Sequence, residues 1–183
     1  MKIGIIVGSV RDDRKGYEVG NWVLGQAKNR TDADYELIDL KDFDLPVLTS
    51  ATVPMAADRQ YESAAVTDWS RALDACDGYV IVTPEYNHGV PGGLKNAIDS
   101  VGPELVGKAV GFVGYGGDGA TRAVEQWRNI FANFQMVTVR QQLAISIMEE
   151  FADGGSFTPA ERRTGELDTL LDQLVPMTHR LRD

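Results

Sequence analysis

The chain has 183 residues, 43% of them hydrophobic and 25% charged, which is ordinary for a globular protein and enough for one domain with a sizeable core. Its net charge of −9 argues against a nucleic-acid partner, because binding a phosphate backbone requires a basic surface. No apolar run approaches the ~20 residues that span a bilayer, and the opening MKIGIIVGSVR lacks the pattern of a signal peptide, so we expect a cytoplasmic protein without a membrane partner.

Strand and helix patterns alternate along the whole chain. The first strand, KIGIIVGS (2–9), is a short continuous apolar run, as expected of a strand that is buried on both faces. Further strands are predicted at 35–40, 78–84, 108–116 and 136–139, the last extending towards 144–147. Helices are predicted from about Gly16 and over 59–75, 92–101 and 121–134, and a final exposed helix from Pro159 has the apolar stripe Leu167, Leu170, Leu171 and Leu174.

This alternation predicts an α/β fold in a single domain spanning residues 1–183. With five strands, the expected form is a flavodoxin-like three-layer sandwich whose parallel sheet has the strand order 2-1-3-4-5. Ligands bind such sheets beyond the carboxyl ends of strands one and three, where the winding direction reverses. The loops GSVRDDRKG and PEYNHGVPGG follow those two strands, so we expect them to lie side by side.

The loop after the first strand is basic in an acidic protein. Residues 1–25 carry four basic and three acidic side chains, a net charge of +1. Free N–H groups and the positive dipole end of the following helix favour a phosphate. The alternative is a solvated basic loop that pairs with Asp12 and Asp13. The residues expected at a phosphate are Ser9, Arg11, Arg14, Lys15 and Gly16.

The loop after the third strand has the composition of a binding site. Pro84 ends the strand, and Pro91 and Gly92 begin the next helix. Tyr86 offers a flat apolar face and Asn87 offers both a donor and an acceptor, which suits an aromatic heterocycle. The alternative is an Asx-type turn with a packed tyrosine.

The loop GYGGDG (114–119) matches the G-x-G-x-x-G pattern of dinucleotide-binding proteins. That pattern belongs to the first strand–helix turn and is followed about 20 residues on by an acidic residue, whereas this is the fourth turn and Arg140 stands at the end of the next strand. We therefore interpret the loop as a third wall of the crevice, where Gly116 and Gly117 let backbone amides approach a planar ligand.

Histidine and cysteine residues indicate no further chemistry. His88 lies in the third-strand loop without a second histidine or a cysteine nearby, so no metal site is predicted. His179 is expected to be solvated, and Cys76 to be buried and inert.

The motifs VGSVR, LPVL, TPEYNHGVPGGLKNAIDS and GYGGDGATRA, in this order over roughly residues 1–145, resemble the NAD(P)H-dependent FMN reductase family. These flavodoxin-like flavoproteins include quinone, azo and chromate reductases. The resemblance implies an enzyme that uses FMN and takes NADPH or NADH as co-substrate. It would reduce quinones, azo compounds, chromate or free flavin by ping-pong hydride transfer, with the chemistry carried by FMN and no catalytic side chain.

The resemblance also assigns positions to the parts of FMN. The phosphate would lie at Ser9, Arg11, Arg14, Lys15 and Gly16; many members have Ser and Asn where this chain has Arg14 and Gly16, so charge replaces hydroxyls here. The flavin ring and ribityl chain would lie against Pro84, Glu85, Tyr86 and Asn87, and the pyrimidine edge at Tyr115, Gly116 and Gly117. It further implies a homodimer or homotetramer that packs the apolar helix 94–101 against a partner.

Two other functions fit the same residues. One is an electron carrier of the flavodoxin type, which the acidic surface would suit. The other is a redox-sensing flavin-binding module that has no steady-state turnover. The Arg-rich first loop and the family motifs favour the reductase.

Overall fold

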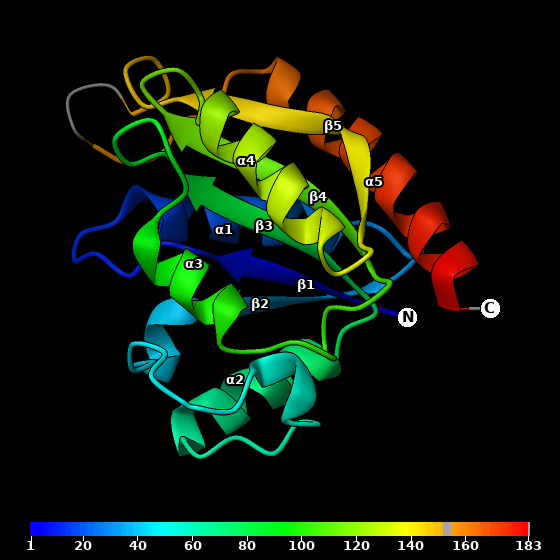
Figure 1. The fold of residues 1–183 in the computed structure, drawn as a ribbon. Helices are drawn as coiled ribbons and strands as arrows, with labels where there is room; N and C mark the ends of the chain where they lie inside the picture. Colours follow the sequence, from blue (N-terminus) through cyan, green and yellow to red (C-terminus); the bar gives the residue numbers. More distant parts are fainter. Residues whose placement is uncertain (152–154, 183) are drawn as a thin grey trace.

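A five-stranded parallel sheet forms the centre of the structure, a computed structural model that describes residues 1–151 and 155–182 (Figure 1). The strand order β2-β1-β3-β4-β5 confirms the predicted flavodoxin-like fold, and every neighbouring pair is parallel. The strands are β1 (Lys2–Val7), β2 (Asp34–Asp39), β3 (Gly78–Pro84), β4 (Ala109–Gly116) and β5 (Val137–Ser146).

Helices cover both faces of the sheet (Figure 1). One face packs against α1 (Lys15–Ala27) and α5 (Arg162–Arg182). The other packs against α2 (Ala64–Asp74), α3 (Gly92–Asp99) and α4 (Thr121–Ala132). In the part of the chain that the structure describes, no helix is both long and apolar enough to cross a membrane.

The central strand β3 shows why the sheet is covered on both sides. All of its residues are buried. Because side chains alternate along a strand, Tyr79 and Ile81 belong to the core under α2, α3 and α4, whereas Val80 and Val82 belong to the core under α1 and α5. The apolar run in the sequence therefore supplies both cores at once.

The second predicted helix begins later than expected. Residues 59–63 are not helical, because Asp58 and Arg59 have φ values of 46° and 61°, in the left-handed region. Ser63 then caps α2 by accepting a hydrogen bond from the N–H of Val66 at 3.4 Å. Serine is among the preferred residues for this position, so the helix starts at Ala64.

The prediction of an exposed C-terminal helix is wrong for its apolar stripe. The stripe residues Leu167, Leu170, Leu171 and Leu174 are at most 1% exposed, and α5 packs on β4 and β5. It begins at Arg162 rather than Pro159. A Cβ at position 111 would lie 2.9 Å from Cδ2 of Leu170, so glycine in β4 allows this close contact.

A buried ion pair fixes the segment between β5 and α5. Arg163 contacts Glu150 at 2.6 Å, and their side chains are 4% and 3% exposed. The Glu150 carboxylate also accepts hydrogen bonds from the backbone N–H groups of Ser146 and Ala160. Burial by itself would raise the pKa of Glu150. The hydrogen bond from Arg163, together with those from the two backbone N–H groups, outweighs this effect, so the pKa of Glu150 is lowered.

We expect Glu150→Gln to destabilise the protein by about 1.5–3 kcal/mol at pH 7, because Arg163 loses its buried charged partner and keeps Glu166, whose side chain is 28% exposed. Since the folded-state pKa of Glu150 is lowered, the pair stabilises the fold above the unfolded-state pKa of about 4.3, and this stability is lost as the pH falls through the folded value. Urea unfolding from pH 7 down to about pH 3 should show the difference between wild type and variant shrinking below about pH 4.

The neighbouring Glu149 is exposed and provides the control. Glu149→Gln should change the free energy of unfolding by less than about 0.5 kcal/mol. Equal effects of the two substitutions would contradict the role given to the buried pair.

Candidate functional site

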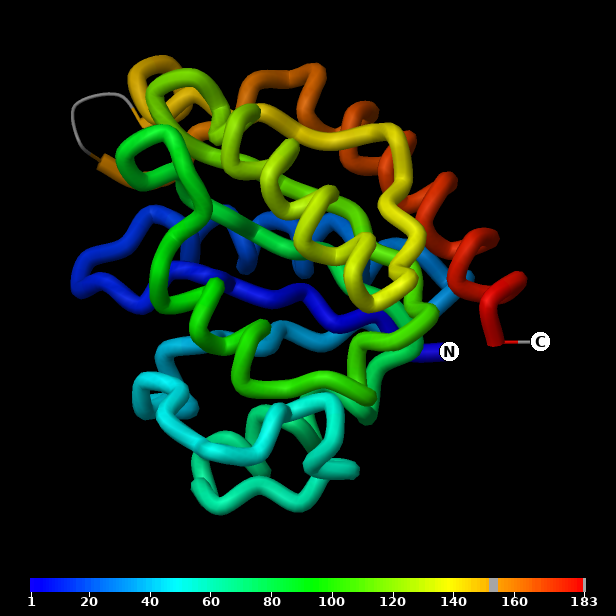
Figure 2. Tube along the Cα trace, in the orientation of Figure 1, coloured from blue at the N-terminus to red at the C-terminus, as the bar shows by residue number. Residues whose placement is uncertain are grey.

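The loops after β1, β3 and β4 meet at one edge of the sheet. β1 pairs with β3 so that Val7 faces Val82, and the N–H of Gly8 donates to the carbonyl of Val82 at 2.9 Å. In Figure 2 the three loops emerge together at the left, opposite the two chain termini. Position 8 needs glycine, because a Cβ there would lie 2.5 Å from Cδ2 of Leu94. The predicted juxtaposition of the first and third loops is therefore present.

A cleft of ≈ 240 Å³ opens between these loops. Most of the residues predicted for ligand binding line it, and they come from all three loops. Gly16, Asn87 and Gly117 are not among the lining residues. The lining consists of Ser9, Arg11, Asp12, Asp13, Arg14, Lys15, Pro84, Glu85, Tyr86, Tyr115, Gly116 and Ile147.

The predicted residues outside the lining directly follow lining residues in the sequence. Gly16 is in the first turn of α1, where a Cβ would collide with the hydroxyl of Tyr115. Glycine at this position thus lets Tyr115 pack against the start of α1. Asn87 and Gly117 are exposed at the tips of the third and fourth loops.

The acidic residues near the first loop do not pair as the sequence alternative supposed. Arg14 pairs with Asp39 at the end of β2, and both side chains are largely buried. Asp12 instead pairs with Lys41 at 2.5 Å. Sequence reasoning missed Asp39; its signal was a lone acidic residue at the carboxyl end of a strand beside the crevice. These two pairs connect the first loop to the end of β2 and to the segment that directly follows it.

The first loop presents several donors towards the cleft. Among the described residues, Nε of Arg14 is a buried donor without a hydrogen-bond partner. Arg14 is also the N-cap residue of α1 and provides no side-chain cap there, so the first-turn N–H groups of the helix are open to an anion. The Arg11 guanidinium lies 5.8 Å from the ring centre of Tyr86, and Nζ of Lys15 lies 4.4 Å from that of Phe151. This donor set fits a phosphate group.

Hydroxyl groups from different loops meet in the cleft. The side chain of Ser9 is 1% exposed, and its hydroxyl lies 2.9 Å from that of Tyr86. Burial raises the pKa of Tyr115, so its phenol stays protonated at neutral pH and can donate a hydrogen bond. The cleft therefore offers neutral donors as well as cations.

Glu85 uses its carboxylate to cap α4. It accepts hydrogen bonds from the backbone N–H groups of Arg122 at 3.0 Å and Ala123 at 3.1 Å. Its side chain is 8% exposed and also pairs with the guanidinium of Arg122 at 2.5 Å. Ala120, the N-cap residue, has no side-chain group to do this. The third loop is thereby attached to the helix that follows the fourth.

We expect Glu85→Ala to lower the free energy of unfolding by about 0.5–2 kcal/mol, because α4 loses its cap. Glu85→Gln keeps an acceptor oxygen and should lose less. Urea unfolding without added flavin measures both. Glu125→Ala, at an exposed site in the same helix, is the control and should stay within about 0.5 kcal/mol of wild type. A loss for Glu85→Ala no larger than that of the control would contradict the capping role.

The histidine and cysteine predictions can be placed on the structure. His88 is exposed at the tip of the third loop and does not line the cleft, and His179 is exposed on α5. Cys76 is 1% exposed, and burial raises the pKa of its thiol to about 11, as expected of an inert cysteine. Among residues 1–151 and 155–182, no three or more His, Cys, Asp or Glu side chains form a group that could hold a metal ion.

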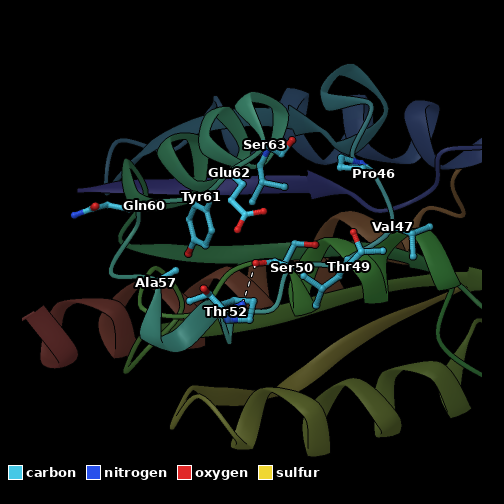
Figure 3. Close-up of a pocket in the computed structure, with 14 residues that line it drawn as sticks. Pro46, Val47, Thr49, Ser50, Thr52, Ala57, Gln60, Tyr61, Glu62 and Ser63 are labelled. Carbon is cyan, nitrogen blue, oxygen red and sulfur yellow. Dashed lines mark hydrogen bonds between the residues drawn. The ribbon is translucent and has the colours of Figure 1, made fainter.

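A second cavity, of ≈ 110 Å³, lies under the loop between β2 and α2 and shares no lining residue with the cleft. Figure 3 shows Tyr61 and Glu62 on one side of it and Ser50 and Thr52 across from them. The only charged residue in its lining is Glu62, so it lacks the cations that a phosphate requires. The donor-rich cleft is the better candidate site.

Fold and cleft together define a flavodoxin-like α/β protein with a phosphate-suited site at the point where the sheet reverses its winding. A family model described as NADPH-dependent FMN reductase matches residues 1–150, and the chain belongs to this family. It is accordingly an NAD(P)H-dependent oxidoreductase with FMN as cofactor.

Individual relatives agree with this assignment. The chain is 34% identical over 157 residues to the NAD(P)H-dependent FMN reductase ntnL of Nectria sp, covering 84% of this chain and 77% of the relative. It is 28% identical over 182 residues to a 2-hydroxy-1,4-benzoquinone reductase of Burkholderia sp, covering 94% and 93%. Among solved structures, the flavoenzyme NAD(P)H:(acceptor) oxidoreductase FerB of Paracoccus denitrificans matches with a TM-score of 0.76 and 26% identity, over 98% of this chain and 97% of that one.

Proposed function

We propose that this chain is a single FMN-binding domain that reduces quinones and similar small acceptors with NAD(P)H. The observation that carries the proposal is the donor set of the first loop: Arg14 has a buried Nε without a partner, Ser9 has a buried hydroxyl, and the first turn of α1 has no side-chain cap. A phosphate would satisfy all three kinds of donor.

The proposed placement of FMN follows the three loops. The first loop holds the phosphate, the third contacts the ring and ribityl chain, and the fourth meets the pyrimidine edge. In this order the residues are Ser9, Arg11, Arg14, Lys15 and Gly16, then Pro84, Glu85, Tyr86 and Asn87, then Tyr115, Gly116 and Gly117.

When bound, FMN supplies the hydride chemistry, between NAD(P)H and the acceptor. The cleft volume of ≈ 240 Å³ is below the range of roughly 300–1,000 Å³ for pockets that enclose a whole small molecule. This supports a site that encloses part of FMN and leaves part of it accessible, where NAD(P)H and then the acceptor can bind. We therefore propose ping-pong kinetics and assign no side chain to catalysis.

Quinones are the proposed acceptors because a relative covering nearly the whole chain is named a benzoquinone reductase. Azo compounds, chromate and free flavin complete the class of small acceptors. The alternatives are an electron carrier and a redox-sensing module. Steady-state oxidation of NADH or NADPH with a benzoquinone separates the reductase from both, because neither alternative turns over.

The phosphate assignment predicts that Arg11→Ala weakens FMN binding by roughly 1.5–3 kcal/mol, the loss of one charge-assisted hydrogen bond. Riboflavin has no phosphate, so its affinity should be nearly unchanged. Fluorescence titration of the flavin-free protein measures both affinities.

The exposed Arg140 at the edge strand β5 provides a matched control. Arg140→Ala removes the same charge and should leave both affinities unchanged. Equal losses for FMN and riboflavin in Arg11→Ala would contradict the placement of the phosphate in the first loop.

We also propose a homodimer or homotetramer, through a different surface from the one expected. Leu94, Ala97 and Ile98 of α3 are 0% exposed, so the apolar side chains of this helix are used within the subunit. The loop between β2 and α2 instead exposes Val47 by 75% and Val53 by 67%. Its apolar residues support self-association through this loop.

Sedimentation at micromolar concentration should therefore show a species larger than the 20.0 kDa chain. The double substitution Val47→Asp and Val53→Asp should shift it towards the monomer, because charges would be buried at the contact. A wild-type monomer would contradict the proposed assembly.

A further inference from the structure

The turn that carries Asn87 has two successive residues in the left-handed backbone region. Tyr86 and Gly89 close it with two backbone hydrogen bonds, of 3.1 Å from the N–H of Tyr86 and 3.0 Å from that of Gly89. The central residues Asn87 and His88 have φ values of 50° and 65°. Asparagine and histidine adopt this left-handed region more often than most residues other than glycine, but two such residues in succession still benefit from contacts that hold the turn.

Gln126 on α4 provides such contacts with both ends of its side-chain amide. Its Nε2 donates to the carbonyl of His88 at 3.0 Å, and its Oε1 accepts from the N–H of Val90 at 3.2 Å. The amide thus pairs with the turn much as a neighbouring strand would. A Cβ at Gly89 would lie 3.3 Å from Oε1, so the backbone passes close to this amide.

The same helix holds the other end of the segment. Glu85 accepts hydrogen bonds from the N–H groups of Arg122 and Ala123, one turn before Gln126. Tyr86 and Asn87 therefore lie between two sets of hydrogen bonds to α4, one made by Glu85 before them and one made by His88 and Val90 after them. Because α4 begins at Thr121, directly after the fourth loop, one helix determines the relative position of the third and fourth loops.

We propose that Gln126 is a positioning residue that holds Tyr86 and Asn87 in place against the flavin ring, an inference that rests on the proposed FMN site. The residues proposed for the phosphate lie on the first loop, which the hydrogen bond from Gly8 to Val82 attaches to the sheet. Ser9 and Arg11 contact the side chain of Tyr86, but the two Gln126 bonds are to the backbone of the third loop. Loss of the Gln126 amide should therefore weaken contacts to the ring far more than contacts to the phosphate.

Gln126→Leu removes both hydrogen bonds and keeps an apolar side chain of similar length. Its dissociation constants for FMN and riboflavin, measured by fluorescence titration, should rise by the same factor of about 3–10, as expected for one or two neutral hydrogen bonds. In the flavin-free protein, amide exchange at Val90 should become faster. Asn129→Leu, which changes an exposed amide side chain on the same helix, should alter none of these values.

A rescue distinguishes positioning from a general effect on helix stability. His88→Gly relieves the left-handed strain in the turn, since glycine accepts positive φ readily. Added to Gln126→Leu, it should recover at least half of the lost affinity on a logarithmic scale. If Gln126→Leu does not fold, Gln126→Glu takes its place, because it keeps the acceptor for Val90 and loses the donor to His88.

Unchanged affinities in the variant, a loss confined to FMN, or unchanged exchange at Val90 would each overturn the proposal while leaving FMN binding by the wild type in place. A wild-type protein that binds neither flavin would overturn both the positioning role and the proposed function. The two failures are thus distinguishable by the wild-type titration alone.

Discussion

The parallel pairing of β1 with β3 is the constraint on which the site depends. Because strand β2 continues the sheet on one side of β1 and β3 on the other, the loops after β1 and β3 diverge to opposite faces and leave a crevice between them. The hydrogen bond from Gly8 to Val82 extends this pairing one residue into the loop. Without the pairing of β1 with β3, the cations of the first loop and the tyrosine of the third loop would not line the same cleft.

Charge is arranged so that a strongly acidic chain keeps cations at the cleft. Three basic and three acidic residues line it, and two of the acidic ones, Asp12 and Glu85, pair with Lys41 and Arg122 outside the lining. Asp39, at the end of β2, pairs with one terminal nitrogen of the Arg14 guanidinium. The Nε atom of Arg14 is buried and has no hydrogen-bond partner. Lys41 forms an ion pair with Asp12. Without this pair, the Asp12 carboxylate could compete with a phosphate for the arginines of the loop. The acidic residues near the site thus orient its cations, and an anionic phosphate completes the donor set rather than replacing an existing partner.

Periodicity and loop composition were sufficient to predict the fold and most of the cleft. The apolar runs of β1, β3 and β4 are short, rich in β-branched or aromatic residues and bounded by turn residues, which indicates buried strands, and their order led directly to the loops that line the cleft. Contacts between distant parts of the chain could not be predicted in this way. The pairing of Arg14 with Asp39 and the capping of α4 by Glu85 join residues whose separation in the sequence contains no periodic signal.

Two further differences have local causes. The stripe of α5 was read as part of an exposed helix, but the apolar faces of β4 and β5 need a cover, and Leu170 fits against Gly111. The late start of α2 follows from two consecutive left-handed residues, Asp58 and Arg59, which helix propensity does not anticipate. In both cases tertiary contacts or single backbone angles overrode an otherwise correct pattern.

We propose that this cleft holds FMN where NAD(P)H can reduce it. The most direct measurement is the visible absorption spectrum of the protein after loading with FMN and removal of free flavin, followed anaerobically on addition of NADPH and then NADH. We expect FMN to be retained and its absorption to be bleached by at least one of the two nucleotides. Retention of FMN without bleaching by either nucleotide, or failure to retain it at all, would contradict the proposed site.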